Sequence, residues 1–301
     1  MGFVSVFMGK RSQLKAYLNS RACAEASPPQ NKDCRPVPIN ILSDSAAIES
    51  EHVFDVYEKI APHFSKTRYK MWPEVSRFLE SLAENSLVLD AGCGNGKNLT
   101  NPKLAMIGSD RALAFCKLAS EETGRDSFCS DISKDTGLSF RAGVFDAVIS
   151  IAVIHHIPSL AGRIAALRQI SRSLKAGGRA LVYVWAMEQE EGSVGARKFA
   201  SQDVFVPWHF QTKYSEEGST EKLEQMHRYY HVFTRLEFEA LLDEVKPWLV
   251  VKRIYFDSNN WSTELVRTDL AWDADVQSTI PLSWKLIVGF AALLLVFRLR
   301  N

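Results

Sequence analysis

The chain has 301 residues and a globular composition, which is enough for one α/β domain with extensions. Its formal net charge is +1 at pH 7, which excludes a globally basic surface, so nucleic-acid binding would need clustered basic groups or a partner. The five cysteines contain no C-x-x-C pair and no Cys/His grouping with zinc spacing, so the sequence predicts a reducing compartment and no metal site.

Residues 1–50 are expected to form a basic, proline-containing extension outside the folded domain. The first 24 residues carry four basic side chains and no acidic one, and residues 27–38 have the composition of a proline-rich linker. Two interpretations stay open. The segment is either an organelle-import signal, which is typically basic and poor in acids, or an unstructured tail of a cytoplasmic protein.

Helical periodicity begins near residue 51, where Val53, Val56 and Ile60 fall on one face of a helix. A second helix is predicted over residues 73–82, because its leading proline suits the first helical position.

A glycine-rich turn follows the first predicted strand. Residues 87–89 form a short apolar run that is typical of a strand buried on both faces, and Asp90 ends it. Gly92, Gly94 and Gly96 then alternate through a tight turn in which a ligand can approach the backbone. A helix is expected to start close after Gly96, with its free N–H groups facing the ligand.

The spacing of these glycines decides between classes of nucleotide-like ligand. It differs from the G-x-x-x-x-G-K-[ST] of a phosphate-binding loop and from the G-x-G-x-x-G of dinucleotide folds. Asp90 would repel a pyrophosphate, whereas it suits a cationic ligand with an amino group. The motif therefore favours a cationic ligand over a diphosphate.

Strands and helices alternate after this turn. Strands are predicted over residues 104–108, 127–130, 145–153 and 179–185, helices over residues 112–120, 163–174 and 238–245, and a terminal hairpin over residues 249–256 and 261–266. Residues 175–178 are expected to stop a helix. This alternation predicts an α/β fold with a seven-stranded, doubly wound, Rossmann-like sheet over residues 51–267, interrupted by an irregular substrate-binding insertion at 186–227.

Polar side chains gather at one edge of this predicted sheet. In a doubly wound sheet the ligand lies outside the carboxyl ends of the strands, and Asp90, Asp110, Asp131 and His155 all fall there. Asp110 follows Asp90 by twenty residues, about where nucleotide folds place a ribose-binding acid. We therefore expect these residues to surround one cofactor.

The Asp-x-Gly-x-Gly-x-Gly motif resembles the first motif of class I S-adenosylmethionine-dependent methyltransferases. The resemblance implies S-adenosylmethionine as the cofactor. The cofactor-binding residues that it implies are Asp90, Gly92, Gly94, Gly96, Asp110, Arg111, Asp131, Ile132 and Ile151.

A more specific resemblance extends over residues 51–267. It rests on residues 57–69, 149–156, 183–189, 203–209 and 228–233, which look like the eukaryotic family of tRNA wobble-uridine carboxymethyl methyltransferases. The family implies an enzyme that forms the methyl ester of 5-carboxymethyluridine at the wobble position of tRNA. It also implies a small zinc-containing activator subunit as a partner.

A carboxylate acceptor needs orientation by cations or donors rather than a base, because it is already ionised at neutral pH. Arg68, His156 and Arg228 are the catalytic candidates, since arginine pairs well with a carboxylate. The candidates for substrate binding are Lys70, His155, Arg197, Trp208, His209, Tyr229 and His231. Each also has a purely structural interpretation, as a packed side chain or a surface charge.

Two other functions stay open. The same strands would serve a small-molecule or lipid-quinone methyltransferase, and a catalytically silent fold could act as a binding module.

Residues 268–301 are expected to form a linker and an apolar tail. Residues 286–297 are apolar on every helical face, which predicts either a core helix or membrane association through residues 280–299. In the second case the protein would be cytoplasmic and tethered to an intracellular membrane.

Overall fold

The computed structural model describes residues 36–39, 44–67, 70–134, 138, 140–193, 196–208 and 226–270. Two compact units divide the chain, Met1–Thr268 and Asp269–Asn301. Among the described residues no helix is both long and apolar enough to cross a membrane. The predictions for Arg68, His209 and residues 280–299 lie outside the described residues.

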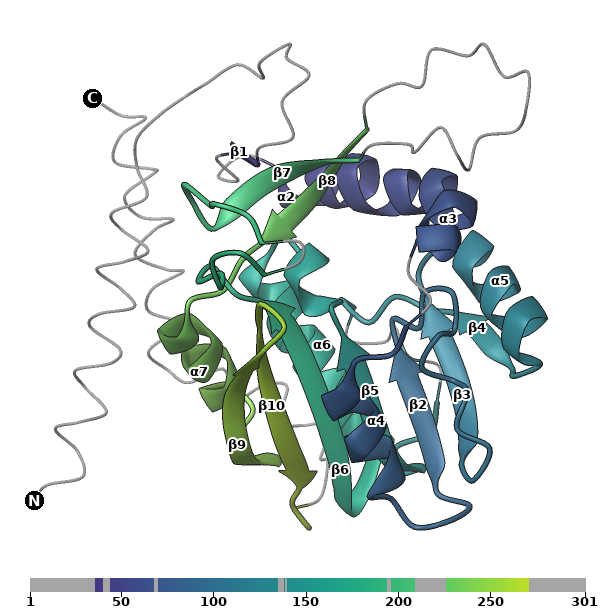
Figure 1. Ribbon diagram of the computed structural model, residues 1–301. Helices are drawn as coiled ribbons and strands as arrows, with labels where there is room; N and C mark the ends of the chain where they lie inside the picture. The colour runs from purple at the N-terminus through teal and green to yellow at the C-terminus, as the bar shows by residue number, and fades with distance from the viewer. Residues whose placement is uncertain are drawn as a thin grey trace, which may run out of the picture. The chain divides into compact units, whose positions relative to one another are not determined.

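A seven-stranded sheet forms the centre of the first unit, in the order β4-β3-β2-β5-β6-β10-β9, which confirms the predicted fold class. Its strands are β2 (Leu87–Ala91), β3 (Ala105–Asp110), β4 (Ser127–Cys129), β5 (Phe145–Ile151), β6 (Leu174–Trp185), β9 (Leu249–Asp257) and β10 (Asn260–Arg267). The first five are parallel, whereas β10 runs antiparallel to both β6 and β9. Figure 1 shows β4 and β9 at the two edges of the sheet.

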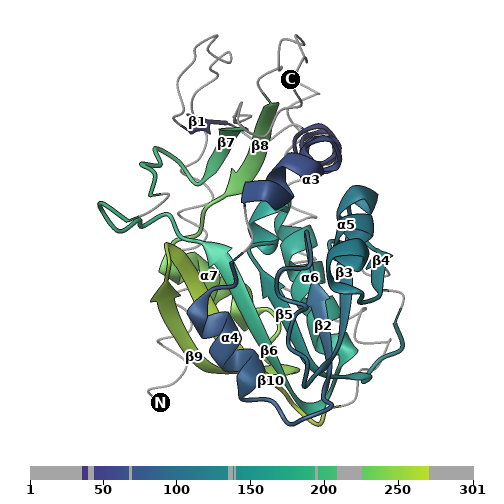
Figure 2. The same cartoon turned by 45° about the vertical axis from the view of Figure 1, so that its right-hand side comes forward.

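Helices cover both faces of the sheet, as Figure 2 shows. One face carries α4 (Pro73–Glu80) and α5 (Leu113–Thr123), and the other carries α6 (Leu160–Ser173) and α7 (Arg235–Asp243). Local sequence sets their ends: α4 has proline in its first turn, the Ser159 and Thr234 side chains cap α6 and α7, and α5 ends at the left-handed Gly124.

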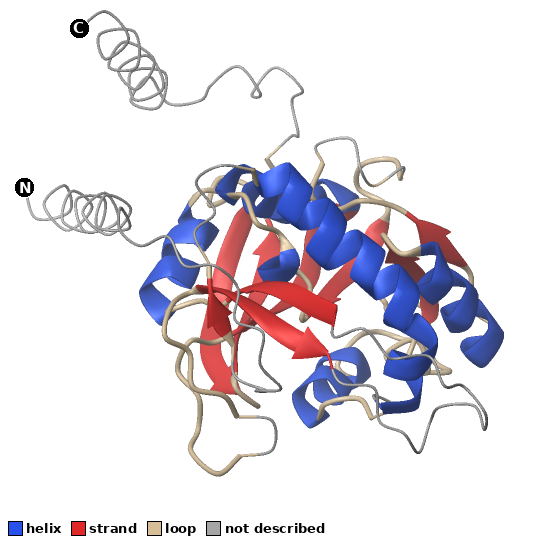
Figure 3. Ribbon diagram, turned by 90° about the horizontal axis from the view of Figure 1, so that it is seen from above, coloured by secondary structure: helices blue, strands red, loops and turns tan. Residues whose placement is uncertain are grey.

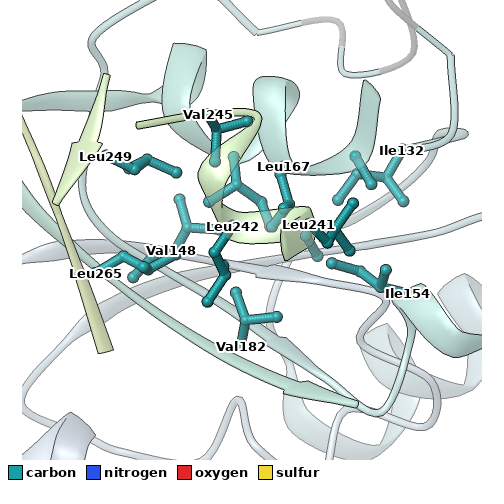
Figure 4. Close-up of a cluster of buried hydrophobic side chains, with 14 of the residues drawn as sticks. Ile132, Val148, Ile154, Leu167, Val182, Leu241, Leu242, Val245, Leu249 and Leu265 are labelled. Atoms are coloured by element: carbon teal, nitrogen blue, oxygen red, sulfur yellow. The ribbon is translucent and has the colours of Figure 1, made fainter. Parts of the chain in front are cut away.

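The larger core cluster lies between the sheet and the helices α6 and α7 (Figure 4). Val148 and Val182 from the sheet pack there with Leu167 of α6 and Leu241 of α7, all of them nearly or fully buried. A second cluster joins β2, β5 and β6 to α4 through Val75 and other apolar side chains. These two layers hold the strand ends in place.

A long N-terminal helical segment lies across the carboxyl ends of the strands (Figures 1 and 3). It consists of α2 (Ser45–Glu49), a π-helical stretch η1 (Ser50–Phe54) and α3 (Asp55–Thr67). It begins earlier than the predicted residue 51, because the side chain of Asp44 accepts the N–H of Ala47 at 2.9 Å and caps it.

A second, three-stranded sheet corrects the expected irregular insertion. It consists of β1 (Val37–Pro38), β7 (Asp203–Trp208) and β8 (Met226–His231), with β7 pairing antiparallel to both neighbours. Part of the predicted N-terminal extension therefore belongs to the fold, because residues 37–38 pair with β7 and α2 starts at Ser45.

One other local prediction was wrong. No helix follows Gly96: residues 97–100 form turns, closed by bonds such as that from the Leu99 N–H to the Gly96 carbonyl. The helix α6 ends at Ser173, directly before residues 175–178, as predicted. They form the start of β6, where its register against β5 shifts between Phe145 and Ala147.

Candidate functional site

A cavity of about 800 Å³ opens at the carboxyl ends of the parallel strands. The loops after β2, β3 and β5 form its floor, and the N-terminal helical segment covers it with Glu49, Val53, Phe54 and Tyr57. The tip of the β9–β10 hairpin closes one side. One cavity thus joins the predicted cofactor residues, except Asp90 and Gly96, to side chains from the N-terminal helix and from β8.

The turn after β2 fits a closely approaching ligand. Gly92 has a φ of +91°, and a Cβ placed on it would lie 2.2 Å from a methyl carbon of Val153. Gly94 has a φ of +53° and open space where its Cβ would lie. Both glycines line the cavity. Gly92 is therefore required by backbone conformation and packing together, whereas Gly94 leaves room beside its backbone.

Asp110 lies at the end of β3 and lines the cavity. One of its oxygens accepts the backbone N–H of Gly94 and the other accepts that of Ala112, both at 2.9 Å. Burial raises the pKa of this carboxyl, although the backbone N–H groups oppose the rise. The carboxylate is fixed in place and keeps lone pairs that could accept the hydroxyls of a ribose.

Asp90 occupies a different position from the one expected. It is fully buried and does not line the cavity, because Asn98 lies against it and lines the cavity instead. Its Oδ2 accepts from the Asn98 amide at 3.3 Å, and its Oδ1 has no hydrogen-bond partner among the described residues. Burial raises the pKa of Asp90 to about 7. Asn98 therefore separates Asp90 from the cavity, contrary to the expectation that Asp90 would face the ligand.

Charged and apolar side chains lie together at the end of the cavity near β4. Asp131 lies 3.7 Å from the guanidinium of Arg111, which stacks on the ring of Phe54 at 4.3 Å. Ile132 is nearly buried beside them, and Glu49 forms an ion pair with Lys134 at 3.4 Å. This end offers an apolar slot with a carboxylate at its rim, which suits a purine base with an amino group.

Ile151 ends β5 and lines the middle of the cavity. It is followed by Ala152 in a left-handed conformation, with a φ of +63°. This strained position turns the chain from β5 into the short helix η2 (Ile154–His156), which brings both histidines to the cavity.

Aromatic side chains form the other end of the cavity. Tyr57, His155, His156, Trp185 and Tyr230 line it, and Tyr230 stacks on Trp185 and on His155 at centroid distances of 4.3 and 5.1 Å. Burial lowers the pKa of His156 to about 3, and it lowers the pKa of His155 well below its usual range. Both imidazoles are therefore neutral at physiological pH. Burial also raises the pKa of Tyr57.

Arg228 lies behind this aromatic wall rather than in it. Its side chain is 2% exposed and is absent from the cavity lining. Its Nη1 donates to the hydroxyl of Tyr230 at 2.7 Å, and its guanidinium lies 4.7 Å from the ring of Trp208. The cation thus reaches the cavity through the hydroxyls of Tyr230 and Tyr57 rather than directly.

Three residues predicted to bind substrate lie inside the protein. Tyr229 is fully buried and donates to Asp203 at 2.6 Å, while His231 lies between Asp203 and Glu237 at 2.6 and 2.8 Å. Trp208 is 5% exposed and stacks on Phe64 at 5.8 Å. The structure places these three in the packing of β7 and β8, where an incoming base does not reach them.

The remaining predicted residues spread over the molecule. Lys70 is exposed and Arg197 is partly buried, and neither lines the cavity. Tyr57, Asn98, Trp185 and Tyr230 were not singled out from the sequence as ligands. Tyr57 shares the apolar face of its helix with core residues, so periodicity alone does not separate it from them.

The fold and the cavity together define a nucleoside-cofactor-binding enzyme of the class I methyltransferase type. A family model described as "Methyltransferase domain" matches residues 89–182. An S-adenosylmethionine-dependent methyltransferase from Clostridium acetobutylicum superposes with a TM-score of 0.53 at 15% identity, covering 71% of this chain and 99% of that one. This likeness supports the fold.

Sequence relatives identify the family. A tRNA (carboxymethyluridine(34)-5-O)-methyltransferase from Schizosaccharomyces pombe is 39% identical over 223 residues, covering 71% of this chain and 95% of that protein. The alkbh8 enzyme of the same name from Xenopus tropicalis is 38% identical over 261 residues, covering 72% of this chain and 41% of that protein. The chain therefore spans about two fifths of the Xenopus relative. The chain belongs to the tRNA (carboxymethyluridine(34)-5-O)-methyltransferase family.

Proposed function

We propose that this protein is an S-adenosylmethionine-dependent tRNA methyltransferase that forms the methyl ester of 5-carboxymethyluridine at the wobble position. The observation that carries the proposal is the single cavity, in which the glycine turn and Asp110 lie at one end and neutral aromatic and imidazole groups lie at the other. Cofactor and acceptor can meet there.

The residues present fit S-adenosylmethionine. Asp110 suits the ribose hydroxyls, and the slot between Phe54, Arg111 and Asp131 suits the adenine. The buried, unpartnered Oδ1 of Asp90 lies near the glycine turn, and above its pKa of about 7 this carboxylate provides negative charge for an amino group beyond Asn98. When bound, the cofactor supplies an electrophilic methyl group on a sulfonium ion.

Methylation of a carboxylate requires no base in this site. A carboxylic acid of ordinary pKa near 4 is ionised at neutral pH, so its oxygen can form the new O–C bond as the S–C bond breaks and the electron pair stays on sulfur. No proton is lost. The protein has to orient the acceptor in line with the methyl group, and proximity supplies most of the acceleration.

The three catalytic candidates take different places in this proposal. His156 lines the cavity, Arg228 acts through Tyr230, and Arg68 follows α3 directly in the sequence. Lys70, Arg197 and His209 are proposed to contact the tRNA outside the cavity, because the first two lie away from its lining.

The test is methylation of tRNA that carries 5-carboxymethyluridine, followed by mass spectrometry of its nucleosides. The methyl ester is expected. S-Adenosylmethionine binding by calorimetry separates the alternatives: binding without ester formation on tRNA, but with methylation of a small carboxylic acid or a quinone, would support a small-molecule methyltransferase. Absence of cofactor binding would support a binding module.

We also propose that a small zinc-containing activator subunit docks along β4. Among the described strands β4 pairs only with β3, so its other edge offers free backbone groups. Phe128 on β4 and Leu113 at the start of α5 are both 49% exposed, which is unusual for large apolar side chains. Phe128→Lys should weaken co-purification of the partner. Val250→Lys on the opposite edge strand, where Val250 is 44% exposed, is the matched control.

We further propose that the protein is cytoplasmic and tethered to an intracellular membrane through residues 280–299. The support is the apolar composition of residues 286–297, flanked by Lys285, Arg298 and Arg300.

A further inference from the structure

A hydrogen-bond chain crosses the aromatic end of the cavity. The Nη1 of Arg228 donates to the hydroxyl of Tyr230 at 2.7 Å, and the hydroxyl oxygens of Tyr230 and Tyr57 lie 3.2 Å apart. The hydroxyl of Tyr57 lies 3.0 Å from Nε2 of His156, and Nδ1 of His156 lies 3.0 Å from the backbone carbonyl of Tyr229. Four consecutive contacts thus join a buried cation to a backbone oxygen.

The two ends of this chain fix its direction. A guanidinium can only donate and a carbonyl can only accept, so Nδ1 of His156 must carry the proton that meets the Tyr229 carbonyl. Because burial holds the pKa of His156 at about 3, the ring is neutral and its Nε2 is an acceptor. Tyr57 therefore donates to His156, and Tyr230 donates to Tyr57.

These contacts use the whole hydrogen-bonding capacity of the His156 ring. Its only proton goes to the Tyr229 carbonyl and its only ring lone pair accepts from Tyr57. It keeps neither a donor nor a base for a substrate, although its ring lines the cavity.

His155 has the opposite arrangement. Its Nδ1 accepts the backbone N–H of Trp185 at 3.1 Å, so the neutral ring carries its proton on Nε2. None of the described residues accepts a hydrogen bond from that Nε2–H. The side chain is 1% exposed and lines the cavity, and its Nε2 is not one of the fully buried polar atoms that lack a partner, so this donor is accessible from the cavity. The acceptor is expected to come from a ligand in the cavity.

We infer that the adjacent histidines hold opposite tautomers and have different roles. His155 presents Nε2–H to the acceptor carboxylate, and His156 is a positioning residue that holds the hydroxyl of Tyr57. The identity of the acceptor rests on the proposed function, whereas the tautomers do not depend on it.

The charge change of the reaction explains why a neutral donor suits this place. The carboxylate anion and the sulfonium cation both lose their charges as the methyl group moves. A directly contacting cation would stabilise the carboxylate more before the reaction than in the transition state, and this would raise the barrier. A neutral N–H orients the oxygen and raises the reaction barrier less. Tyr230 keeps Arg228 away from that oxygen.

Histidine nitrogen shifts test the tautomers without any substrate. The full chain, labelled with ¹⁵N-histidine, is examined by long-range ¹H–¹⁵N correlation at pH 7.5, and His155→Gln and His156→Gln assign two of the seven histidines. The expected result is an Nε2–H pattern for His155 and an Nδ1–H pattern for His156. Identical tautomers, or an imidazolium at either position, would overturn the inference.

Single-turnover methyl transfer at saturating cofactor tests the roles. His155→Asn keeps an acceptor for the Trp185 N–H but lacks the Nε2–H, so we expect a rate about tenfold lower, while His155→Gln recovers most of it. His156→Gln keeps an acceptor for Tyr57, so its rate should stay within about threefold of the wild-type rate. The rates of His156→Asn and Tyr57→Phe should both be about tenfold lower. The same cofactor Kd in all variants shows that the site is intact.

The two hypotheses fail in different ways. If His155→Asn reacts at the wild-type rate, or if His156→Gln is as slow as His156→Asn, the assignment of roles is wrong although the ester still forms. If wild type forms no ester on the tRNA while the nitrogen shifts show opposite tautomers, the proposed function fails and the tautomer assignment stands.

Discussion

The backbone N–H of Gly94 donates to a carboxylate oxygen of Asp110 at 2.9 Å. This bond joins the glycine turn after β2 to the last residue of β3, sixteen residues further along the chain. Asp110 therefore holds the shape of the cofactor end as well as offering oxygens to a ribose, and Ala112 completes its orientation.

Asp110→Asn should weaken S-adenosylmethionine binding by about 1.5–3 kcal/mol, the cost of losing charge-assisted hydrogen bonds. The measurement is calorimetry on the full chain. Asp243→Asn is the matched control, because Asp243 ends α7 and pairs with Lys246 just beyond it, away from the cavity. Equal affinities of wild type and Asp110→Asn would remove Asp110 from the cofactor site.

Gly92→Ala should destabilise the fold by more than about 3 kcal/mol, because the new Cβ would lie 2.2 Å from Val153 at a φ of +91°. Gly124→Ala is the control. Its φ is +67° but its Cβ would have open space, so only the backbone cost of about 1 kcal/mol is expected. Urea unfolding measures both, and similar losses for the two variants would contradict the packing argument.

Sequence patterns predicted the parallel sheet because its strands are short apolar runs followed by polar residues at one edge. They failed where the backbone closes turns instead of a helix and where distant segments pair. The helix after Gly96 is replaced by turns around Asn98, and β7 and β8 pair across a separation in sequence that periodicity does not reveal. The small sheet also needs residues 37–38, which have the composition of a linker.

In the candidate site, too, some residues could be placed from the sequence and others depend on tertiary packing. Asp110, Asp131 and the glycines could be placed from motif spacing, since that spacing fixes them to strand ends. Arg228 and His231 lie on opposite faces of β8 and both are buried, because other elements pack against both faces of this strand, and this packing does not follow from motif spacing.

Asp90 should make the stability of the protein depend on pH. Its pKa is about 7 in the folded protein against 3.8 ordinarily, so the folded state holds the proton more tightly than the unfolded state. The resulting stabilisation is present at low pH and is lost as pH rises from about 4 to 7. The free energy of unfolding of wild type, relative to Asp90→Asn, should therefore fall by about 2–3 kcal/mol from pH 5 to 7 and level off above.

Urea titrations of both proteins at each pH give this difference, in which the other titrating groups cancel. Asp126→Asn, an exposed position, controls for the loss of one acidic side chain. A difference that stays constant from pH 5 to 7 would show that Asp90 is ionised in the folded protein across this range and would contradict the prediction.

Removal of residues 280–301 should release the protein from membranes into the soluble fraction with its activity retained. The physical reason is the loss of the apolar run at 286–297. Fractionation of cells and an activity assay on the released protein are the measurements. A truncated protein that fails to fold would instead assign these residues to the core, and an unchanged distribution would mean that the tail does not anchor the protein.

Methyl transfer should be nearly independent of pH between about 6 and 9. The acceptor carboxylate is ionised throughout that range. Burial keeps the pKa of His156 at about 3 and that of His155 well below its usual range, so both rings stay neutral, and it raises the pKa of Tyr57, so its hydroxyl stays protonated. No group at the aromatic end of the cavity therefore has to gain or lose a proton for the reaction.

Single-turnover rates at saturating cofactor are the appropriate measurement, because the ionisation of Asp90 near pH 7 could change cofactor affinity. Tyr57→Phe is the informative variant: it should lower the rate at every pH without adding a slope, since Tyr57 donates its proton to His156 and does not release it. A rate that rises about tenfold per pH unit would mean that a proton is removed from the acceptor before methyl transfer. In that case the acceptor would be a hydroxyl or a ring nitrogen, and the carboxylate assignment would be wrong.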